Sequence, residues 1–219
     1  MINHMHCLLC VSPVSVLHTK QDAQRGELIY WLCNQPEGCG LIFLDPTKRV
    51  SAIDEKARYD THHNETGVAG YRTFLERLTT PLIPLLPPSA HGIDFGCGPV
   101  PVLSEIMEQR GFTVENYDPF YFCDEQLLTQ SYDFITLSEV TEHLFNPLQT
   151  FEQLSRMLKP GGHLAVMTEM VTSTDQFANW WYQRDKTHVC FYSPKTFSWL
   201  AKRFNWQVRF PVNNVAIFC

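Results

Sequence analysis

Residues 91–219 alternate between short apolar segments and amphipathic ones, and this alternation constrains the fold more than any other feature of the sequence. Short apolar runs predict strands, and apolar residues at helical spacing predict the helices between them. The predicted strands are 92–95, 112–117, 132–137, 163–169, 206–210 and 215–218, and the predicted helices are 101–110, 147–158 and 194–203. Strands that alternate with helices indicate an α/β fold whose parallel sheet is covered on both faces.

A glycine-containing segment, Asp94-Phe95-Gly96-Cys97-Gly98, joins the first of these strands to its helix. Glycines at this junction let the backbone approach a ligand closely. Asp118 follows twenty residues after Gly98, at the end of the next strand, where a carboxylate can accept hydrogen bonds from both ribose hydroxyls. The pair predicts a nucleoside site, and a tight turn with a surface aspartate is the alternative.

The loop departs from the dinucleotide fingerprint at its third glycine position, which Pro101 occupies. That fingerprint needs a glycine there for close packing of the helix that holds a pyrophosphate. The departure disfavours NAD and FAD, although a nicotinamide oxidoreductase stays open as an alternative.

Four motifs in this order resemble the class I S-adenosylmethionine-dependent methyltransferases, over about residues 52–219. They are Asp94–Gly98, Tyr132–Ile135, Glu139–Leu144 and Leu158–Gly162. The resemblance implies a Rossmann-like, doubly wound, seven-stranded sheet whose last strand is antiparallel. The last two predicted strands, separated by a tight turn at Asn213 and Asn214, agree with that expectation.

The resemblance also implies which residues bind the cofactor, S-adenosyl-L-methionine. Each part of the cofactor is assigned the residues that would contact it. Gly96, Cys97 and Gly98 would contact the methionine part, Asp94 would support the ammonium, Asp118 would bind the ribose, Phe120 would pack on the adenine, and Ser138 and Glu139 would flank the methyl group.

One position and one segment depart from the family pattern. Val100 stands where the family often has glycine, and the segment 119–131 is too short for a helix and a strand. The usual acidic contact to adenine therefore has only Asp124 as a candidate.

Methyl transfer from a sulfonium is an in-line displacement, in which positioning supplies most of the catalysis. A general base is needed only when the acceptor must lose a proton. The candidate catalytic residues are His143, His188, Asp185 and Glu142. The alternative for Glu142 and His143 is a capping or pairing role in the first turn of a helix.

Aromatic residues are dense between positions 177 and 199 and surround Arg184-Asp185-Lys186-Thr187-His188. Aromatic walls with a few polar groups are typical of small-molecule pockets, so this segment is predicted to bind the acceptor. The alternative, preferred for Phe177, Phe197 and Trp199, is packing on the sheet. Tyr59, His63 and Asn64 are predicted to form the opposite wall.

Four cysteines lie in the first forty residues, in two pairs that flank predicted strands at 27–32 and 40–44. Cys7 and Cys10 have the C-x2-C spacing of a metal knuckle, and Cys33 and Cys39 form a longer second loop. A zinc-ribbon-like module with structural zinc is predicted, and His4 or His6 could replace a ligand. Ordinary reduced cysteines are the alternative.

Three domains are therefore predicted: a zinc-ribbon-like module at 1–50, a helical connector and cofactor lid at 51–90, and the methyltransferase domain at 91–219. Proline residues after position 80 and the change from a helical to an alternating pattern set the second boundary.

The composition of the chain disfavours several classes of binding partner. The formal net charge of -6 supplies no basic field for nucleic acid, and no apolar run is long enough for a membrane span. Eight scattered cysteines do not form a disulfide scaffold, which favours the cytoplasm. A small-molecule methyl acceptor is the expected partner. The alternative function is a catalytically inactive scaffold that binds a protein or RNA through the ribbon.

Overall fold

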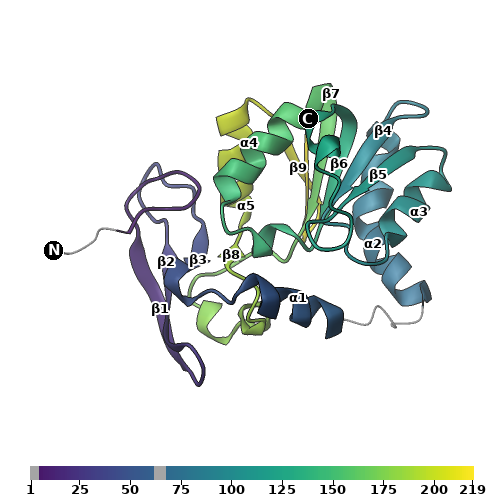
Figure 1. The fold of residues 1–219 in the computed structure, drawn as a ribbon. Coiled ribbons are helices and arrows are strands. Elements are labelled where there is room, and N and C mark those ends of the chain that lie inside the picture. Colours follow the sequence, from purple (N-terminus) through teal and green to yellow (C-terminus); the bar gives the residue numbers. More distant parts are fainter. Residues whose placement is uncertain (1–4, 62–67) are drawn as a thin grey trace.

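The computed structural model describes residues 5–61 and 68–219, which form a large sheet, a smaller N-terminal sheet and the helices around them (Figure 1). The large sheet has the strand order β5-β4-β6-β7-β10-β9. Its strands are β4 (His91–Phe95), β5 (Thr113–Tyr117), β6 (Tyr132–Ser138), β7 (Leu158–Met167), β9 (Val208–Val212) and β10 (Val215–Phe218). Strands β5, β4, β6 and β7 are parallel, and β10 is antiparallel to both of its neighbours. The α/β fold class and the antiparallel last strand are confirmed.

The strand count differs from the expected seven, because the large sheet has six strands among the described residues. The chain between β5 and β6 holds only a short bridge, Asp118 to Phe122, and a 3-10 helix, η3 (Glu125–Thr129). A further parallel strand here would need a crossover on each side, and each crossover takes about a dozen residues. The segment 118–131 is too short for that, so β5 is the edge strand of this sheet.

Helices cover both faces of the large sheet, as Figure 1 shows. One face carries α2 (Val68–Leu82) and α3 (Val102–Glu108), and the other carries α4 (Pro147–Met157) and α5 (Pro194–Phe204). Side chains alternate between the two cores along each strand, as the pleat requires. In β7, Leu164 and Val166 belong to the core of α4 and α5, whereas Ala165 and Met167 belong to the core of α2 and α3.

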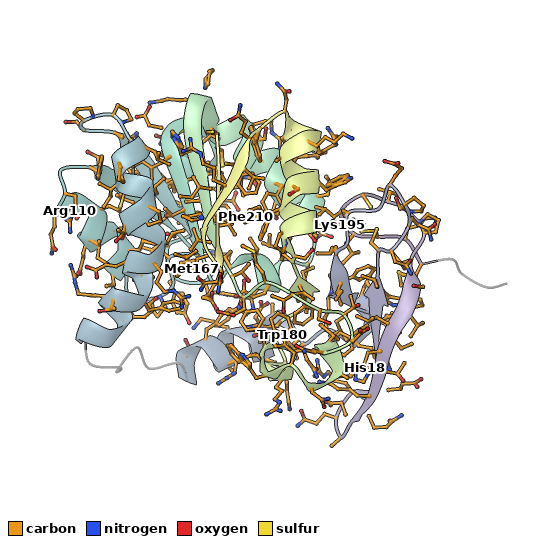
Figure 2. The ribbon with its side chains drawn as sticks, turned by 180° about the vertical axis from the view of Figure 1, so that it is seen from behind. His18, Arg110, Met167, Trp180, Lys195 and Phe210 are labelled. Atoms are coloured by element: carbon orange, nitrogen blue, oxygen red, sulfur yellow. The ribbon has the colours of Figure 1, made fainter. Side chains whose placement is uncertain are left out.

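The rear view in Figure 2 shows side chains filling the space on both sides of the sheet. Met167 lies within this packing, whereas Arg110 and Lys195 lie at the outer surface.

The N-terminal sheet contains a strand from far along the chain. Its strand order is β1-β2-β3-β8, with β1 (Ser15–Asp22), β2 (Gly26–Leu32), β3 (Ile42–Leu44) and β8 (Cys190–Phe191). In this antiparallel sheet Ile42 pairs with Phe191, and Phe43 pairs with Cys190. The apolar core under it is continuous with the core of α4 and α5. The N-terminal segment therefore packs as part of one body with the rest of the chain.

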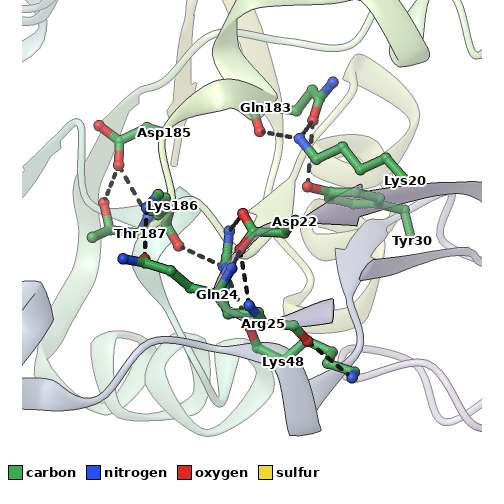
Figure 3. Close-up of polar contacts among 10 residues, drawn as sticks. All are labelled: Lys20, Asp22, Gln24, Arg25, Tyr30, Lys48, Gln183, Asp185, Lys186 and Thr187. Carbon is green, nitrogen blue, oxygen red and sulfur yellow. Dashed lines mark hydrogen bonds and ion pairs between the residues drawn. The ribbon is translucent and has the colours of Figure 1, made fainter. Parts of the chain in front are cut away.

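The hairpin of β1 and β2 holds the segment around residue 183 by polar contacts (Figure 3). The Lys20 ammonium and the Tyr30 hydroxyl both donate to the Gln183 side chain. At the hairpin turn, Arg25 donates to the Lys186 carbonyl over 3.4 Å, and Lys186 donates to Gln24 over 2.9 Å. Sequence analysis did not predict β1, so these contacts were not expected.

Helix α1 (Ala52–Thr61) joins the N-terminal sheet to α2 and lies across the end of the large sheet. The remaining short helices are η1 (Pro46–Lys48), η2 (Ile83–Leu85), η4 (Thr141–His143), η5 (Phe177–Asn179) and η6 (Trp181–Arg184). Within the described residues, every helix is too short or too polar to cross a bilayer.

Candidate functional site

A cavity of about 800 Å³ opens at the carboxyl ends of β4, β5 and β6. Helix α1 and the segment 181–188 form its other walls. In doubly wound sheets, ligands bind outside the carboxyl ends of the strands, and this volume lies in the range of small-molecule sites. The cavity is therefore the candidate active site.

The loop after β4 forms one wall with its backbone. Gly96 and Gly98 have positive φ angles of 83° and 67°, which glycine adopts without strain. The Tyr117 carbonyl accepts hydrogen bonds from the backbone N–H groups of Gly96 and Cys97. A Cβ on Gly96 would lie 2.5 Å from Val140 Cγ2, whereas one on Gly98 would meet no described atom within 4 Å. Gly98 thus faces open space in the cavity.

Asp118 lies at the end of β5 and lines the cavity beside this loop. Its Oδ2 accepts from the Gly98 N–H over 3.1 Å, and its Oδ1 accepts from the N–H groups of Phe120 and Tyr121. Oδ1 thus accepts two hydrogen bonds, whereas Oδ2 accepts one and keeps further acceptor capacity. The carboxylate is therefore fixed against the loop and can still accept hydrogen bonds from a ligand. Phe120 also lines the cavity.

Asp94 lies beneath the loop and does not line the cavity. It is 3% exposed and accepts a hydrogen bond of 2.7 Å from the Thr136 hydroxyl. Burial raises the pKa of Asp94 to about 7, against the lowering effect of the Thr136 hydrogen bond.

The last residue of β6 and the residue after it also line the cavity. They are Ser138 and Glu139, and Glu139 has a positive φ of 54°. A residue other than glycine in this backbone region marks a constrained site. Burial and then the neighbouring Glu142 charge raise the pKa of Glu139 well above its ordinary value.

Glu142 is fully buried beside Glu139 and does not line the cavity. Its oxygens accept hydrogen bonds from the hydroxyls of Thr168 and Tyr182, and the Tyr182 hydroxyl also lies 3.1 Å from the Glu139 carboxylate. One hydroxyl proton can serve only one of these carboxylates at a time. Burial and the charges of both glutamates raise the pKa of Tyr182, so it stays a donor.

His143 and His188 face each other in the cavity, with ring centroids 4.8 Å apart. The Nδ1 atom of His143 lies 3.1 Å from the Thr187 carbonyl, and that of His188 lies 2.8 Å from the Tyr182 carbonyl. Burial lowers the pKa of His143 to about 4, so its ring is neutral near pH 7. A carbonyl only accepts hydrogen bonds, so each Nδ1 carries a proton, and Nε2 of the neutral His143 ring offers a lone pair.

Asp185 links the segment 181–188 to α1. It forms an ion pair of 3.0 Å with Arg58 and accepts hydrogen bonds from the backbone and hydroxyl of Thr187. Burial opposes ionisation, but these hydrogen bonds and the positive charges nearby hold the pKa of Asp185 well below its usual range. Asp185 lines the cavity as a structural carboxylate of its wall.

Most of the aromatic residues between 177 and 199 pack in the core. Phe177 and Phe197 are buried, and Trp199 packs against the same core, as the alternative interpretation holds. Trp181 and Tyr182 line the cavity, and Trp181 is 60% exposed at its rim. The segment thus gives the cavity few aromatics and uses the rest to attach itself to the protein.

Helix α1 contributes the opposite wall. The Tyr59 ring contacts the rings of Phe120 and His143, with centroids 5.9 and 5.2 Å away. His63 and Asn64, predicted for the same wall, lie outside the described residues, as does His4. Asp124 caps η3 and does not line the cavity, and Val100 is exposed outside it.

Sequence analysis missed several cavity residues, among them Glu55, Arg58, Tyr71 and Phe74. These four come from α1 and α2, which have helical spacing but carry no recognisable motif. It also missed the contact between Tyr182 and the two glutamates, because these residues lie far apart in the sequence.

The four N-terminal cysteines form a second candidate site. Their sulfur atoms all lie within 4.8 Å of one another, with Cys7 and Cys39 3.4 Å apart and Cys10 and Cys33 3.3 Å apart. Sulfurs around a tetrahedral zinc with bonds of 2.3 Å are about 3.8 Å apart. The cluster therefore fits a zinc ion. His6 instead forms a β-bridge with Pro13.

Comparison with known proteins agrees with this geometry. A family model described as "Methyltransferase domain" matches residues 62–209, more than half of the chain. Among curated proteins, none matches the sequence significantly.

Several solved structures have similar folds. A chain of the Haloferax volcanii complex between the Trm112 methyltransferase activator and a candidate methyltransferase is 12% identical, with 73% of this chain and 96% of that chain covered and a TM-score of 0.51. An O-methyltransferase family protein from Burkholderia thailandensis is 12% identical, with 75% and 61% covered and a TM-score of 0.50. An S-adenosylmethionine-dependent methyltransferase from Archaeoglobus fulgidus is 21% identical, with 63% and 71% covered and a TM-score of 0.49. At these identities the likeness concerns the fold alone.

Proposed function

The chain belongs to the methyltransferase domain family, and from this premise we propose that it transfers a methyl group from S-adenosylmethionine to a small-molecule acceptor. The observation that carries the proposal is one cavity lined by two chemically different groups of residues. The glycine loop and Asp118 form the first group, here called the cofactor end, and His143, His188 and Tyr182 form the second, here called the acceptor end. A group-transfer enzyme needs such a site, because donor and acceptor must meet in line.

The residues at the first end fit the cofactor. Asp118 would accept hydrogen bonds from the ribose hydroxyls, and Phe120 would pack on the adenine. The open space at Gly98 leaves room for the methionine part beside Gly96 and Cys97. Asp94, held under the loop by Thr136, would support the ammonium end through its charge. Ser138 and Glu139 would flank the sulfonium, whose methyl group is already activated for transfer.

The second end would position the acceptor. Tyr59 and Trp181 supply apolar surface to the cavity lining, and His143 and His188 supply imidazole rings. Of the four catalytic candidates, these two histidines can contact an acceptor. Asp185 is engaged with Arg58 and Thr187, and Glu142 is buried behind Tyr182, so we assign both a positioning role.

The four cysteines would bind a structural zinc ion. Zinc would add to the stability of the N-terminal sheet, because the free energy of metal binding to a folded site is also folding free energy. Because this sheet contains β8 and contacts Gln183 and Lys186, the zinc would also stabilise the acceptor end of the cavity. Helix α1, which belongs to the predicted 51–90 segment and lines the cavity, would act as the cofactor lid.

Ligand-dependent thermal stability tests the proposal. S-adenosylmethionine and its demethylated product should each raise the melting temperature, since a ligand at one hundred times its Kd stabilises by about 2.7 kcal/mol. NAD is the matched control and should leave the melting temperature unchanged. Transfer of radiolabelled methyl groups to fractionated metabolites would then identify the acceptor. A shift with NAD alone would support the oxidoreductase alternative, and no shift with any of the three would support the scaffold alternative.

A further inference from the structure

We propose that Glu142, His143 and His188 bind a divalent first-row transition-metal ion at the acceptor end of the cavity. Each residue offers one ligand atom, and these atoms lie within 4.8 Å of one another. Donors around a tetrahedral ion with bonds of about 2.1 Å are about 3.4 Å apart, so side-chain adjustments of about an ångström complete the site. The assignment goes beyond methyl transfer, which by itself needs no metal.

The orientation of both histidine rings suits metal binding. Each Nδ1 donates to a backbone carbonyl, of Thr187 for His143 and of Tyr182 for His188. Such hydrogen bonds fix the tautomer and the ring plane of metal-binding histidines and leave Nε2 as the ligand atom. Two rings with the same arrangement, 4.8 Å apart and facing one cavity, form a pre-oriented pair of nitrogen donors.

The charges around the site also favour a cation. Glu139 and Glu142 lie together, and Glu142 is fully buried. Their hydrogen-bond donors are the hydroxyls of Thr168 and Tyr182, and Glu139 Oε1 is buried without a hydrogen-bond partner. Across the described ranges 5–61 and 68–219, neither glutamate is in an ion pair with a lysine or arginine. A buried Glu142 carboxylate without a counter-charge would be costly, and a divalent ion bound by Glu142 would supply that charge.

The donor set indicates the class of ion. Two imidazoles and one carboxylate suit Zn²⁺, Fe²⁺ or Mn²⁺, whereas Mg²⁺ and Ca²⁺ prefer oxygen ligands. Three protein ligands leave coordination positions for other molecules. On the premise of the proposed function, these positions would take an oxygen or nitrogen atom of the acceptor, because His143 and His188 line the cavity. The acceptor class is then a small molecule with such a donor next to the methylated atom.

Metal counting on the full chain tests the site. The protein is loaded with excess Zn²⁺, freed of unbound ion by gel filtration and analysed by mass spectrometry of its metal content. The wild type should hold two zinc ions per chain, one at the cysteines and one at this site. His143→Gln and His188→Gln should each hold one. His163→Gln, at a histidine on β7 outside the cavity, is the matched control and should hold two.

A second measurement does not depend on the variants folding. Mn²⁺ binds weakly to thiolates, so it probes this site in the presence of the cysteines. Pulsed electron paramagnetic resonance of the Mn²⁺-loaded wild type should show coupling to two imidazole nitrogens. Full retention of zinc in a folded His188→Gln, or no nitrogen coupling, would each overturn the proposal. Cofactor binding is measured separately by the melting shift, so failure of the metal site and failure of methyltransferase function give different results.

Discussion

The two ends of the cavity are built in different ways. The cofactor end consists of two short continuous segments, 94–98 and 117–121, whose backbone groups bond to each other and to the Asp118 carboxylate. The acceptor end brings together η4, the segment 182–188 and the β1–β2 hairpin, which are distant in sequence. Local backbone geometry therefore defines the cofactor end, whereas long-range packing defines the acceptor end.

The largest expected effect tests whether the acceptor end depends on the cysteine cluster. Cys33→Ser removes a ligand from the proposed zinc site, and zinc supplies about 10 kcal/mol of folding free energy in small zinc modules. We expect the N-terminal sheet and the segment 182–191 to lose protection in hydrogen exchange, because β8 pairs with β3. Cofactor affinity should stay within about threefold, less than 1 kcal/mol.

Cys123→Ser is the matched control, because Cys123 is an exposed cysteine outside the cluster. It should leave both hydrogen exchange and cofactor binding unchanged. A parallel loss of cofactor affinity in Cys33→Ser would show that the two ends are one cooperative unit, contrary to the comparison drawn above.

This difference explains how much of the site the sequence could predict. The Gly96–Gly98 loop and Asp118 are recognisable because a positive φ and a carboxylate at a strand end leave a local pattern. The structure brings both into one cavity. The hairpin strand β1 and the pairing of Phe191 with Ile42 carry no such pattern. They depend on packing between distant segments, which periodicity does not encode.

The same reasoning applies to the fold. The parallel strands were predicted to within a few residues because each is a short apolar run, whereas β7 begins at Leu158, five residues before its predicted start. The expected seventh strand came from the resemblance alone. The short segment 118–131 was visible in the sequence, and it is the physical reason for the six-stranded sheet.

The next effect concerns charge under the cofactor loop. The folded-state pKa of Asp94 is raised from 3.8 to about 7, so the folded chain binds more protons than the unfolded chain between these values. Stability should therefore fall as pH rises from about 4 to 7, and the shift corresponds to roughly 4 kcal/mol when complete. Asp94→Asn should remove this fall and be more stable than the wild type at pH 8 in urea unfolding. It should also bind the cofactor more weakly there.

Asp133→Asn is expected to change the stability at pH 8 in the opposite direction. The His91 N–H and the Lys159 ammonium lower the pKa of Asp133, so its ionised form adds stability above its unfolded pKa that is lost as pH falls. This variant should be less stable than the wild type at pH 8. If Asp94→Asn were also less stable than the wild type at pH 8, ionisation of the buried Asp94 carboxylate would not lower the stability of the folded chain.

A smaller effect is expected at Asp118. Asp118→Ala removes the acceptor for the N–H groups of Gly98, Phe120 and Tyr121, as well as for the ribose. We expect cofactor affinity to fall by more than 1 kcal/mol and unfolding free energy by about 2 kcal/mol. Calorimetric titration and urea unfolding measure the two losses. Asp124→Ala, at a carboxylate that caps η3 outside the cavity, should leave cofactor affinity unchanged. Equal cofactor affinity in Asp118→Ala and Asp124→Ala would show that Asp118 does not bind the cofactor.

The smallest effects separate two neighbouring glycines within the cofactor end. Both have positive φ, so alanine at either position should cost about 1 kcal/mol of stability from backbone strain. At Gly96 the added Cβ also meets Val140 at 2.5 Å, so Gly96→Ala should be the less stable variant, and Val140→Ala should restore part of the loss. At Gly98 the Cβ enters open cavity, so Gly98→Ala should lose cofactor affinity out of proportion to its stability. Urea unfolding measures the loss of stability in each variant, and calorimetric titration measures the loss of cofactor affinity. If the loop contacts the cofactor, the affinity loss relative to the stability loss should be larger for Gly98→Ala than for Gly96→Ala. An equal ratio in the two variants would mean that the loop only shapes the fold.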